Sequence, residues 1–235
     1  MATACAGGDD DGGAEEDEGQ PQQGGTLTFG AEQFPANLNC IDALNNIAWC
    51  YYMAQVPVLW GAYEQLPDIS YSPQLLEGEA EIDEGPPFTV TYNIKEAAAW
   101  SDGTPITAQD FVFSAEVNAD TKNNFVHGGT GWDLITDSEV NNDKSVTFTF
   151  KEPYSQYKGL FSGSSGYLYP AHVLEGEDLT KVWNECICDP ATGEPIGSGP
   201  FLVTEFKKNT RIVLEADKDW WGAEEYGGPY LDSIE

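Results

Sequence analysis

The most reactive side chains in this sequence belong to five cysteines and two histidines: Cys5, Cys40, Cys50, Cys186, Cys188, His127 and His172. With Cys5 set aside, the remaining cysteines form an even number, which suits disulfides and allows three pairings. Cys40 and Cys50 are the favoured local pair. A bridge between Cys186 and Cys188 would be strained, so we expect one or both of them to pair elsewhere.

A metal site is the alternative for the two later cysteines. Cys186 and Cys188 could share a metal ion with His172, the softer ligand nearest to them in the sequence. Zinc sites usually separate paired cysteines by about two to four residues, whereas one residue, Ile187, separates these. We therefore favour disulfides, and we expect no metal ion and no cofactor.

Catalytic motifs are absent from the sequence. Residues 163–166 lack the spacing of the Gly-x-Ser-x-Gly nucleophile elbow, and neither a zinc-protease motif nor a phosphate-binding loop occurs. His127 lies among glycines, as exposed loop residues do, and His172 fits a capping or packing role. Forty acidic residues leave a glycosidase carboxylate pair open as an alternative, but no particular pair is indicated. The sequence thus favours binding over turnover.

The overall charge argues against two classes of partner. Forty acidic residues against ten basic ones give a formal net charge of −30. Residues 9–18 hold seven of the acids, so the remainder keeps 33 acids against 10 bases, a net charge of −23. Such a surface repels nucleic-acid phosphates and anionic lipid headgroups. We expect no nucleic-acid partner and attribute the charge mainly to solubility.

Residues 1–23 are expected to be a disordered acidic tether. Ala2-Thr3-Ala4-Cys5 resembles the end of a lipobox, in which small residues precede the cysteine that receives lipid, although Ala2 stands where leucine is usual. Residues 7–23 are low in complexity and too polar to bury a core, so they would form a spacer behind a lipidated Cys5. The start has no basic or apolar region of a complete signal peptide. No apolar run approaches the roughly 18 residues of a membrane span.

A well-formed helix start lies in the middle of the chain. Asp102-Gly103 is a strong turn pair, and Thr107 with Asp110 three residues later makes a capping-box pattern. The helix that follows has one apolar face, because its apolar residues recur at helical spacing: Ala108, Phe111, Val112 and Ala115.

Strands are expected where apolar and polar residues alternate: at 24–30, 88–94 and 145–151, and in a hairpin of 197–206 with 211–216. Residues 45–66 have mostly helical spacing, with Pro57 kinking or ending the helix. Residues 121–137, rich in glycine, read as a loop.

Three blocks in order carry a resemblance to a known family. They are Trp-Ser-Asp-Gly-Thr-Pro-Ile-Thr-Ala-Gln-Asp-Phe-Val-Phe-Ser from Trp100, Tyr-Pro-Ala-His-Val-Leu from Tyr169, and Gly-Ser-Gly-Pro-Phe from Gly197. Together they resemble the extracytoplasmic substrate-binding proteins of ABC importers, in the peptide/nickel-binding family, family 5. The resemblance implies an α/β periplasmic-binding-protein-like lobe. Residues 24–61 and 186–235 would belong to lobe I and residues 62–185 to an inserted α+β subdomain.

The resemblance also implies a function. Members of this family are longer than this chain, so we expect it to be an N-terminal portion that lacks the second lobe. Two lobes would close over a solute by hinge motion, and an ABC permease with its ATPase would recognise the closed form. Oligopeptides or dipeptides are the default solute, and a nickel complex or an oligosaccharide is the alternative. An exported carbohydrate hydrolase is a more distant alternative function. The protein would act outside the cytoplasmic membrane, held there by lipid.

Four residues are candidate ligand contacts on the same grounds. Glu32, Gln33 and Phe34 occupy the place where the first lobe of the family meets its ligand, and Trp132 lies in a glycine-rich loop that the family places near the interlobe cleft. A glutamate there could pair with an ammonium group. Extended backbone could add β-type hydrogen bonds to a peptide.

Overall fold

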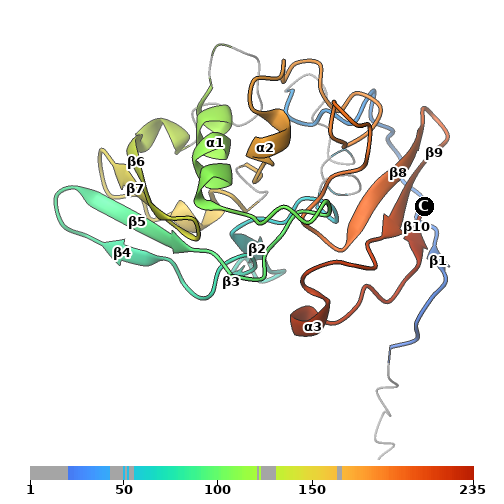
Figure 1. The fold of residues 1–235 in the computed structure, drawn as a ribbon, viewed down its shortest axis with the longest axis horizontal. Coiled ribbons are helices and arrows are strands. Elements are labelled where there is room, and N and C mark those ends of the chain that lie inside the picture. The colour runs from blue at the N-terminus through green and yellow to red at the C-terminus, as the bar shows by residue number, and fades with distance from the viewer. Residues whose placement is uncertain are drawn as a thin grey trace, which may run out of the picture.

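The computed structural model describes residues 21–42, 50, 52, 56–120, 122, 131–162 and 166–235. Residues 1–20 of the tether expected over 1–23, including Cys5, lie outside the described residues, as does His127. Three sheets are found within the described part of the chain (Figure 1).

One of two four-stranded sheets comes from the middle of the sequence. Its order is β4-β5-β7-β6 and all its pairs are antiparallel: β4 is Glu81–Asp83, β5 Phe88–Asn93, β7 Ser145–Phe150 and β6 Ile135–Asn142. Strands β5 and β7 confirm the predicted alternation, because every second residue of β5 is buried. The loop expected over 121–137 is wrong at its end, since β6 begins at Ile135 and pairs there with Phe150.

Helix α1, Ala108–Ala119, packs beside this sheet (Figure 1). The predicted capping box is present: the Asp110 carboxylate accepts from the Thr107 backbone N–H at 2.7 Å. Phe111 is fully buried and lies 5.7 Å, ring centre to ring centre, from Tyr92 on β5. The capped start and the apolar face therefore fix the helix against the sheet.

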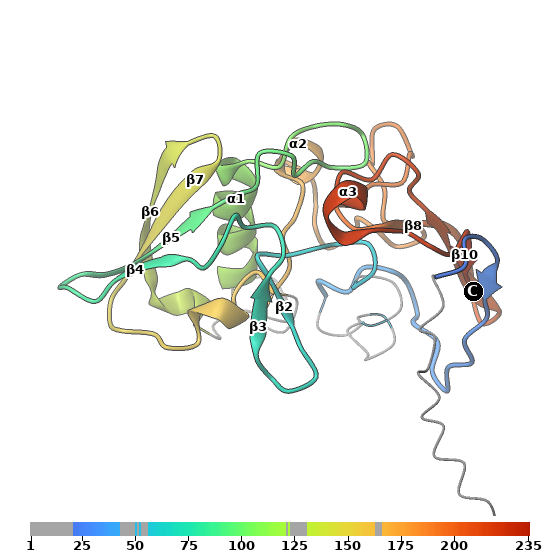
Figure 2. The same ribbon diagram turned by 90° about the horizontal axis from the view of Figure 1, so that it is seen from below.

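A second four-stranded sheet joins the beginning and the end of the described chain. Its order is β1-β10-β9-β8, with β1 at Thr26–Leu27, β10 at Ser233–Ile234, β9 at Arg211–Ala216 and β8 at Phe201–Lys207. Strands β8 and β9 form the predicted hairpin. Strand β1 runs parallel to β10, so the blue and red ends of the chain lie side by side (Figure 2).

A short hairpin, β2 (Tyr63–Gln65) with β3 (Tyr71–Pro73), replaces the end of the helix expected over 45–66. That prediction is wrong at 63–65; residues 43–49, 51 and 53–55 lie outside the described part. The physical reason is a close backbone approach: Ala62 N donates to Phe161 O at 2.6 Å. A Cβ on Gly61 would lie 1.8 Å from the same oxygen, so only glycine at this position allows the two backbone segments to come this close.

Short helical segments complete the described fold: the 3₁₀ turns Trp132–Leu134 and Tyr157–Gly159, α2 at Ala171–Leu174 and α3 at Ala223–Tyr226. One continuous cluster of buried apolar residues runs from β5 and β7 to β8 and β9. Trp183 and Trp220 belong to the buried core, and Trp221 is partly buried.

The four later cysteines form two disulfides. Cys40 is bonded to Cys50 with a Cα–Cα distance of 6.0 Å. Cys186 is bonded to Cys188 with a Cα–Cα distance of 5.3 Å, which differs from our expectation that one or both would pair elsewhere. That separation falls within the range of about 4.4–6.8 Å usual for disulfides, so the local backbone brings the two residues close enough. The thiols of Cys186 and Cys188 are thereby bonded to each other. The described residues contain no group of three or more potential metal ligands.

Candidate solute groove

A groove of about 560 Å³ lies beside the sheet that contains β1. One wall is residues 28–35, which directly follow β1, and the other comes from residues 209–212, Leu214 and Glu235. The structure therefore brings Glu32, Gln33 and Phe34, three of the four predicted contacts, to one cavity.

Backbone pairing at the sheet edge positions the first wall. Gly24 N donates to Tyr230 O at 2.7 Å, and Phe29 N donates to Glu235 O at 2.7 Å. Beyond Phe29 the chain leaves the sheet, and residues 30–33 are exposed with no regular structure. An exposed, non-helical backbone at a sheet edge presents N–H and C=O groups that a ligand backbone can use.

The groove has an apolar floor. The Phe34 ring stacks on Phe206 of β8 with their centres 5.5 Å apart and an interplanar angle of 29°. Phe34, Ile212 and Leu214 line the cavity, and Phe206 is the stacking partner of Phe34. Stacked rings fix the direction of the Phe34 side chain, so this wall is anchored to the hairpin.

The charged side chains of the groove differ in whether they are paired. Arg211, the sole arginine of the chain, donates from Nη2 to Glu205 Oε2 at 2.7 Å, and its Nη1 lies 3.7 Å from Glu235 Oε1. The hydrogen bond from Arg211 lowers the pKa of the Glu205 carboxyl and raises that of Arg211 itself. Glu32 makes no ion pair with any described residue. Its carboxylate is therefore available to a cationic group of a solute.

Trp132, the fourth predicted contact, lies elsewhere. Its side chain is 1% exposed, and its ring meets Phe161 edge to face at 4.8 Å. Gly131, at φ +82°, precedes it and turns the chain inward. The expectation of an accessible aromatic contact is corrected: the indole packs in the core and lines none of the groove.

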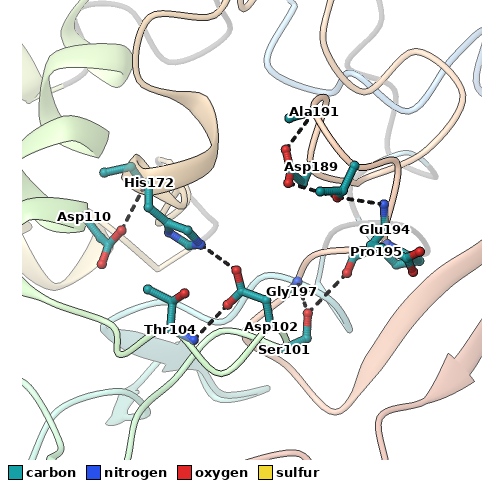
Figure 3. A network of polar contacts seen from close by, with 12 residues as sticks. Ser101, Asp102, Thr104, Asp110, His172, Asp189, Ala191, Glu194, Pro195 and Gly197 are labelled. Carbon is teal, nitrogen blue, oxygen red and sulfur yellow. Dashed lines mark hydrogen bonds and ion pairs between the residues drawn. The ribbon is translucent and has the colours of Figure 1, made fainter.

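A polar network that the sequence did not predict joins the turn at residues 101–104 to α2 and to the segment at residues 195–197 (Figure 3). His172 Nε2 on α2 is 2.8 Å from Asp102 Oδ2, and Ser101 N in the same turn donates to Gly197 O at 2.8 Å. The three blocks that carry the family resemblance thus meet at one place. Their spacing in the sequence gives no sign of this contact, because about 70 residues separate Asp102 from His172.

This network has no catalytic geometry. The Ser101 hydroxyl donates to Pro195 O at 3.3 Å and accepts from Gly197 N at 3.1 Å, so it is turned away from His172 (Figure 3). Burial opposes ionisation of Asp102, but bonds from the Thr104 backbone and from His172 outweigh it and lower its pKa. The carboxylate is therefore a charged structural partner of the imidazole.

Comparison with solved structures gives the class of the fold. The chain is similar to the periplasmic EDTA-binding protein EppA, with a TM-score of 0.76, 32% identity, and coverage of 92% of this chain and 40% of that one. It is also similar to AppA from Bacillus subtilis in complex with a nonapeptide, with a TM-score of 0.72, 25% identity, and 92% and 40% coverage. The fold is that of part of a periplasmic solute-binding protein.

Residues 70–235 match the bacterial extracellular solute-binding proteins, family 5 (Middle), and the chain belongs to this family. Curated relatives include the oligopeptide-binding protein OppA of Mycobacterium tuberculosis, 29% identical over 221 residues that make up 91% of this chain and 35% of that protein. The oligopeptide-binding protein AppA of Bacillus subtilis is 29% identical over 216 residues, 92% of this chain and 37% of that protein. The chain spans about a third of the length of these relatives.

Membership confirms the resemblance inferred from the three sequence blocks, and the homologues in this family are extracytoplasmic solute-binding proteins. Within the described residues, every helix is too short or too polar to cross a lipid bilayer.

Proposed function

We propose that this chain is part of the solute-binding receptor of an ABC importer that captures oligopeptides outside the membrane and delivers them unchanged to a permease. The observation that carries the proposal is the groove beside β1. Its exposed backbone at residues 30–33, the Glu32 carboxylate and the apolar floor of Phe34 and Ile212 match the three parts of a peptide: backbone, ammonium group and apolar side chain. The oligopeptide-binding names of the curated relatives support the same solute class.

In this proposal a second lobe closes the groove. Leu27 and Phe29 are 48% and 46% exposed beside the groove, which is unusual for large apolar side chains in neighbouring positions. Residues 24–61 and 186–235 form parts of lobe I, and residues 62–185 form its inserted subdomain. The much greater length of the relatives supports a further lobe. Closure over the solute by hinge motion then signals occupancy to the permease and its ATPase.

The proposal includes an anchor. Cys5 would carry lipid, and the acidic residues that follow would hold the receptor away from the bilayer surface, whose anionic headgroups repel them. Mass spectrometry of the protein isolated from membranes tests this, because a diacylated Cys5 adds a defined mass that a Cys5→Ser variant lacks.

Calorimetric titration of the full-length protein with unmodified peptides of two to nine residues tests the solute class. We expect saturable binding that weakens when the peptide ammonium is acetylated, and at least tenfold weaker binding by residues 1–235 alone because half of the cleft wall is then absent. Tight binding by residues 1–235 would refute the two-lobe part of the proposal. Absence of binding to every peptide would refute the solute class.

A polycarboxylate metal chelate is the second candidate solute. The similarity to the EDTA-binding EppA favours it, and it retains the receptor role with a non-peptide ligand. The same titration with nickel–EDTA and with an oligosaccharide separates the candidates. An enzymatic role is tested by incubation with chromogenic glycosides, for which we expect no turnover.

A further inference from the structure

A second cavity, of about 350 Å³, lies apart from the groove at the start of β2. Its lining includes Tyr52, Trp60, Tyr63, Glu64 and Gln74, and we call it the Trp60 pocket. The lining combines aromatic rings with amide and carboxylate groups. Small-molecule sites commonly pair an apolar wall with a few convergent polar groups.

The Trp60 ring is a rigid platform. The backbone N–H of Trp60 donates to Ser198 Oγ at 2.8 Å. The Trp60 ring packs edge to face with the rings of Trp220 and Tyr226, with centre-to-centre distances of 4.8 Å and 5.0 Å. The side chain is only partly buried. A ring that neighbouring rings hold in place while part of it reaches the surface can accept a ligand with little loss of side-chain entropy.

The pocket carries an unmatched negative charge. Glu64 is exposed and forms no ion pair with a described residue. The nearby cations are already engaged. Lys158 Nζ lies 5.5 Å from the centre of the Tyr63 ring and pairs with Glu79 Oε2 at 2.7 Å. Lys95 Nζ donates to Glu225 Oε1 at 2.7 Å and to Gln74 O at 3.0 Å and also contacts the Tyr226 hydroxyl. An aromatic face beside a free carboxylate favours a cation through both the ring quadrupole and the charge.

A covalent link joins the walls of the two cavities. The groove wall ends at Pro35 and the chain reaches Cys40, whose disulfide to Cys50 stands two residues before Tyr52 of the Trp60 pocket. In Figure 2 the segment after β1 and the β2–β3 hairpin lie on the same side of the molecule. The Cys40–Cys50 disulfide thus ties the segment that follows the groove wall to the segment that supplies Tyr52.

We propose that the Trp60 pocket is a subsite of the solute site and takes a cationic side chain, an ammonium or guanidinium group, of the bound peptide. The inference rests on the proposed peptide-receptor function and adds a specificity to it. Glu64 supplies the counter-charge and Trp60 the aromatic face. A neutral side chain of the same length would gain only apolar contact.

Calorimetric titration of the full-length receptor with tetrapeptides tests this. The probes are tetra-alanine and its variants with a single lysine or norleucine at each position in turn. At one position we expect lysine to bind about fivefold or more tighter than norleucine. Glu64→Gln should remove most of that preference and leave norleucine affinity unchanged. The matched control is Glu139→Gln on β6, which removes an exposed carboxylate far from Glu64 in the sequence. This variant should keep the preference for lysine.

Trp60→Leu should also reduce the lysine preference, with circular dichroism to confirm the fold; Glu64→Gln alters an exposed side chain and decides the matter if Trp60→Leu is unstable. A preference that survives Glu64→Gln, or the absence of any preference while tetra-alanine still binds, overturns the subsite and leaves the receptor role intact. Failure of every peptide to bind, tetra-alanine included, refutes the proposed function and the subsite with it.

Discussion

Asp110 on α1 ties the starts of two helices together: its Oδ2 accepts from Thr107 N at 2.7 Å while its Oδ1 accepts from Ala171 N of α2 at 2.9 Å. The side chain is 3% exposed. A single carboxylate therefore satisfies helix-terminal donors that would otherwise be buried without partners. This links the block that begins at Trp100 with the block that begins at Tyr169.

Replacement of Asp110 by alanine should lower the free energy of unfolding by about 2–3 kcal/mol, because the buried Ala171 N–H and the partly buried Thr107 N–H lose their acceptor. Burial, the largest influence, raises the pKa of this carboxyl despite its bonds to Thr107 and Ala171. The folded protein thus holds this proton more tightly than the unfolded chain, so the contribution of Asp110 falls as pH rises from the unfolded pKa through the folded one. Urea unfolding at pH 4 and pH 7 should show a larger loss for Asp110→Ala at pH 4. An equal loss at both pH values would contradict this.

The ion pair of Asp102 with His172 should have the opposite pH dependence. The pKa of Asp102 is lowered in the folded state, so its contribution is present above the unfolded pKa of about 3.8 and is lost as pH falls through the folded value. Asp102→Asn should cost about 1 kcal/mol at pH 6, because the pair is partly exposed and the Thr104 N–H also loses charge assistance. The difference between the urea midpoints of the variant and the parent should shrink as pH is lowered from 6 towards 2.5. Glu139→Gln, an exposed carboxylate without an ion pair to a described residue, is the control.

Gly61 offers a sharp steric test. A Cβ at this position would lie 1.8 Å from Phe161 O, whereas a Cβ on Gly78 meets nothing within 4 Å. Gly61→Ala should therefore destabilise the protein by about 3 kcal/mol or more, since backbone must move to relieve the overlap. Gly78→Ala should change stability by less than about 1 kcal/mol. Thermal unfolding of both variants measures the difference, and similar melting temperatures would refute the close approach of Gly61 to Phe161.

The acidic surface should make stability depend on salt. With 33 acids against 10 bases outside residues 9–18, like charges repel one another in the compact state. We expect the melting temperature to rise as sodium chloride increases from about 0.02 M to 1 M, where the screening length falls from some 20 Å to about 3 Å. Sucrose at matched water activity is the control for general solute effects. A flat salt response would mean that the carboxylates are too far apart to interact.

The sequence predicted best those elements whose pattern is local. Strand β5 alternates over six residues, and α1 carries both its cap and its apolar face within twelve, so each can be recognised from its own residues. Strand β2 could not be recognised in this way. It covers three residues in a stretch with helical spacing, and its conformation is set by β3 and by the distant Phe161.

The sequence likewise predicted only part of the candidate site. Glu32, Gln33 and Phe34 were located through their place in the family pattern, and the groove brings them together. The prediction for Trp132 is wrong because a glycine-rich loop indicates an accessible side chain. The burial of this ring depends on Phe161 and on the close approach of Gly166, where an added Cβ would lie 2.8 Å from the indole. The Trp60 pocket gave no sequence signal, since its walls come from separate segments.

Strand β1 pairs with β10 across 207 residues, as in the contact of Thr26 with Ser233. During synthesis the first strand therefore waits without its neighbour until the last part of this region has emerged. The wall that contains Glu32 is assembled late, after the β8–β9 hairpin exists to receive it. The groove can therefore form only once Glu235 has joined the chain, because this residue lines the groove and its carbonyl oxygen holds Phe29 N.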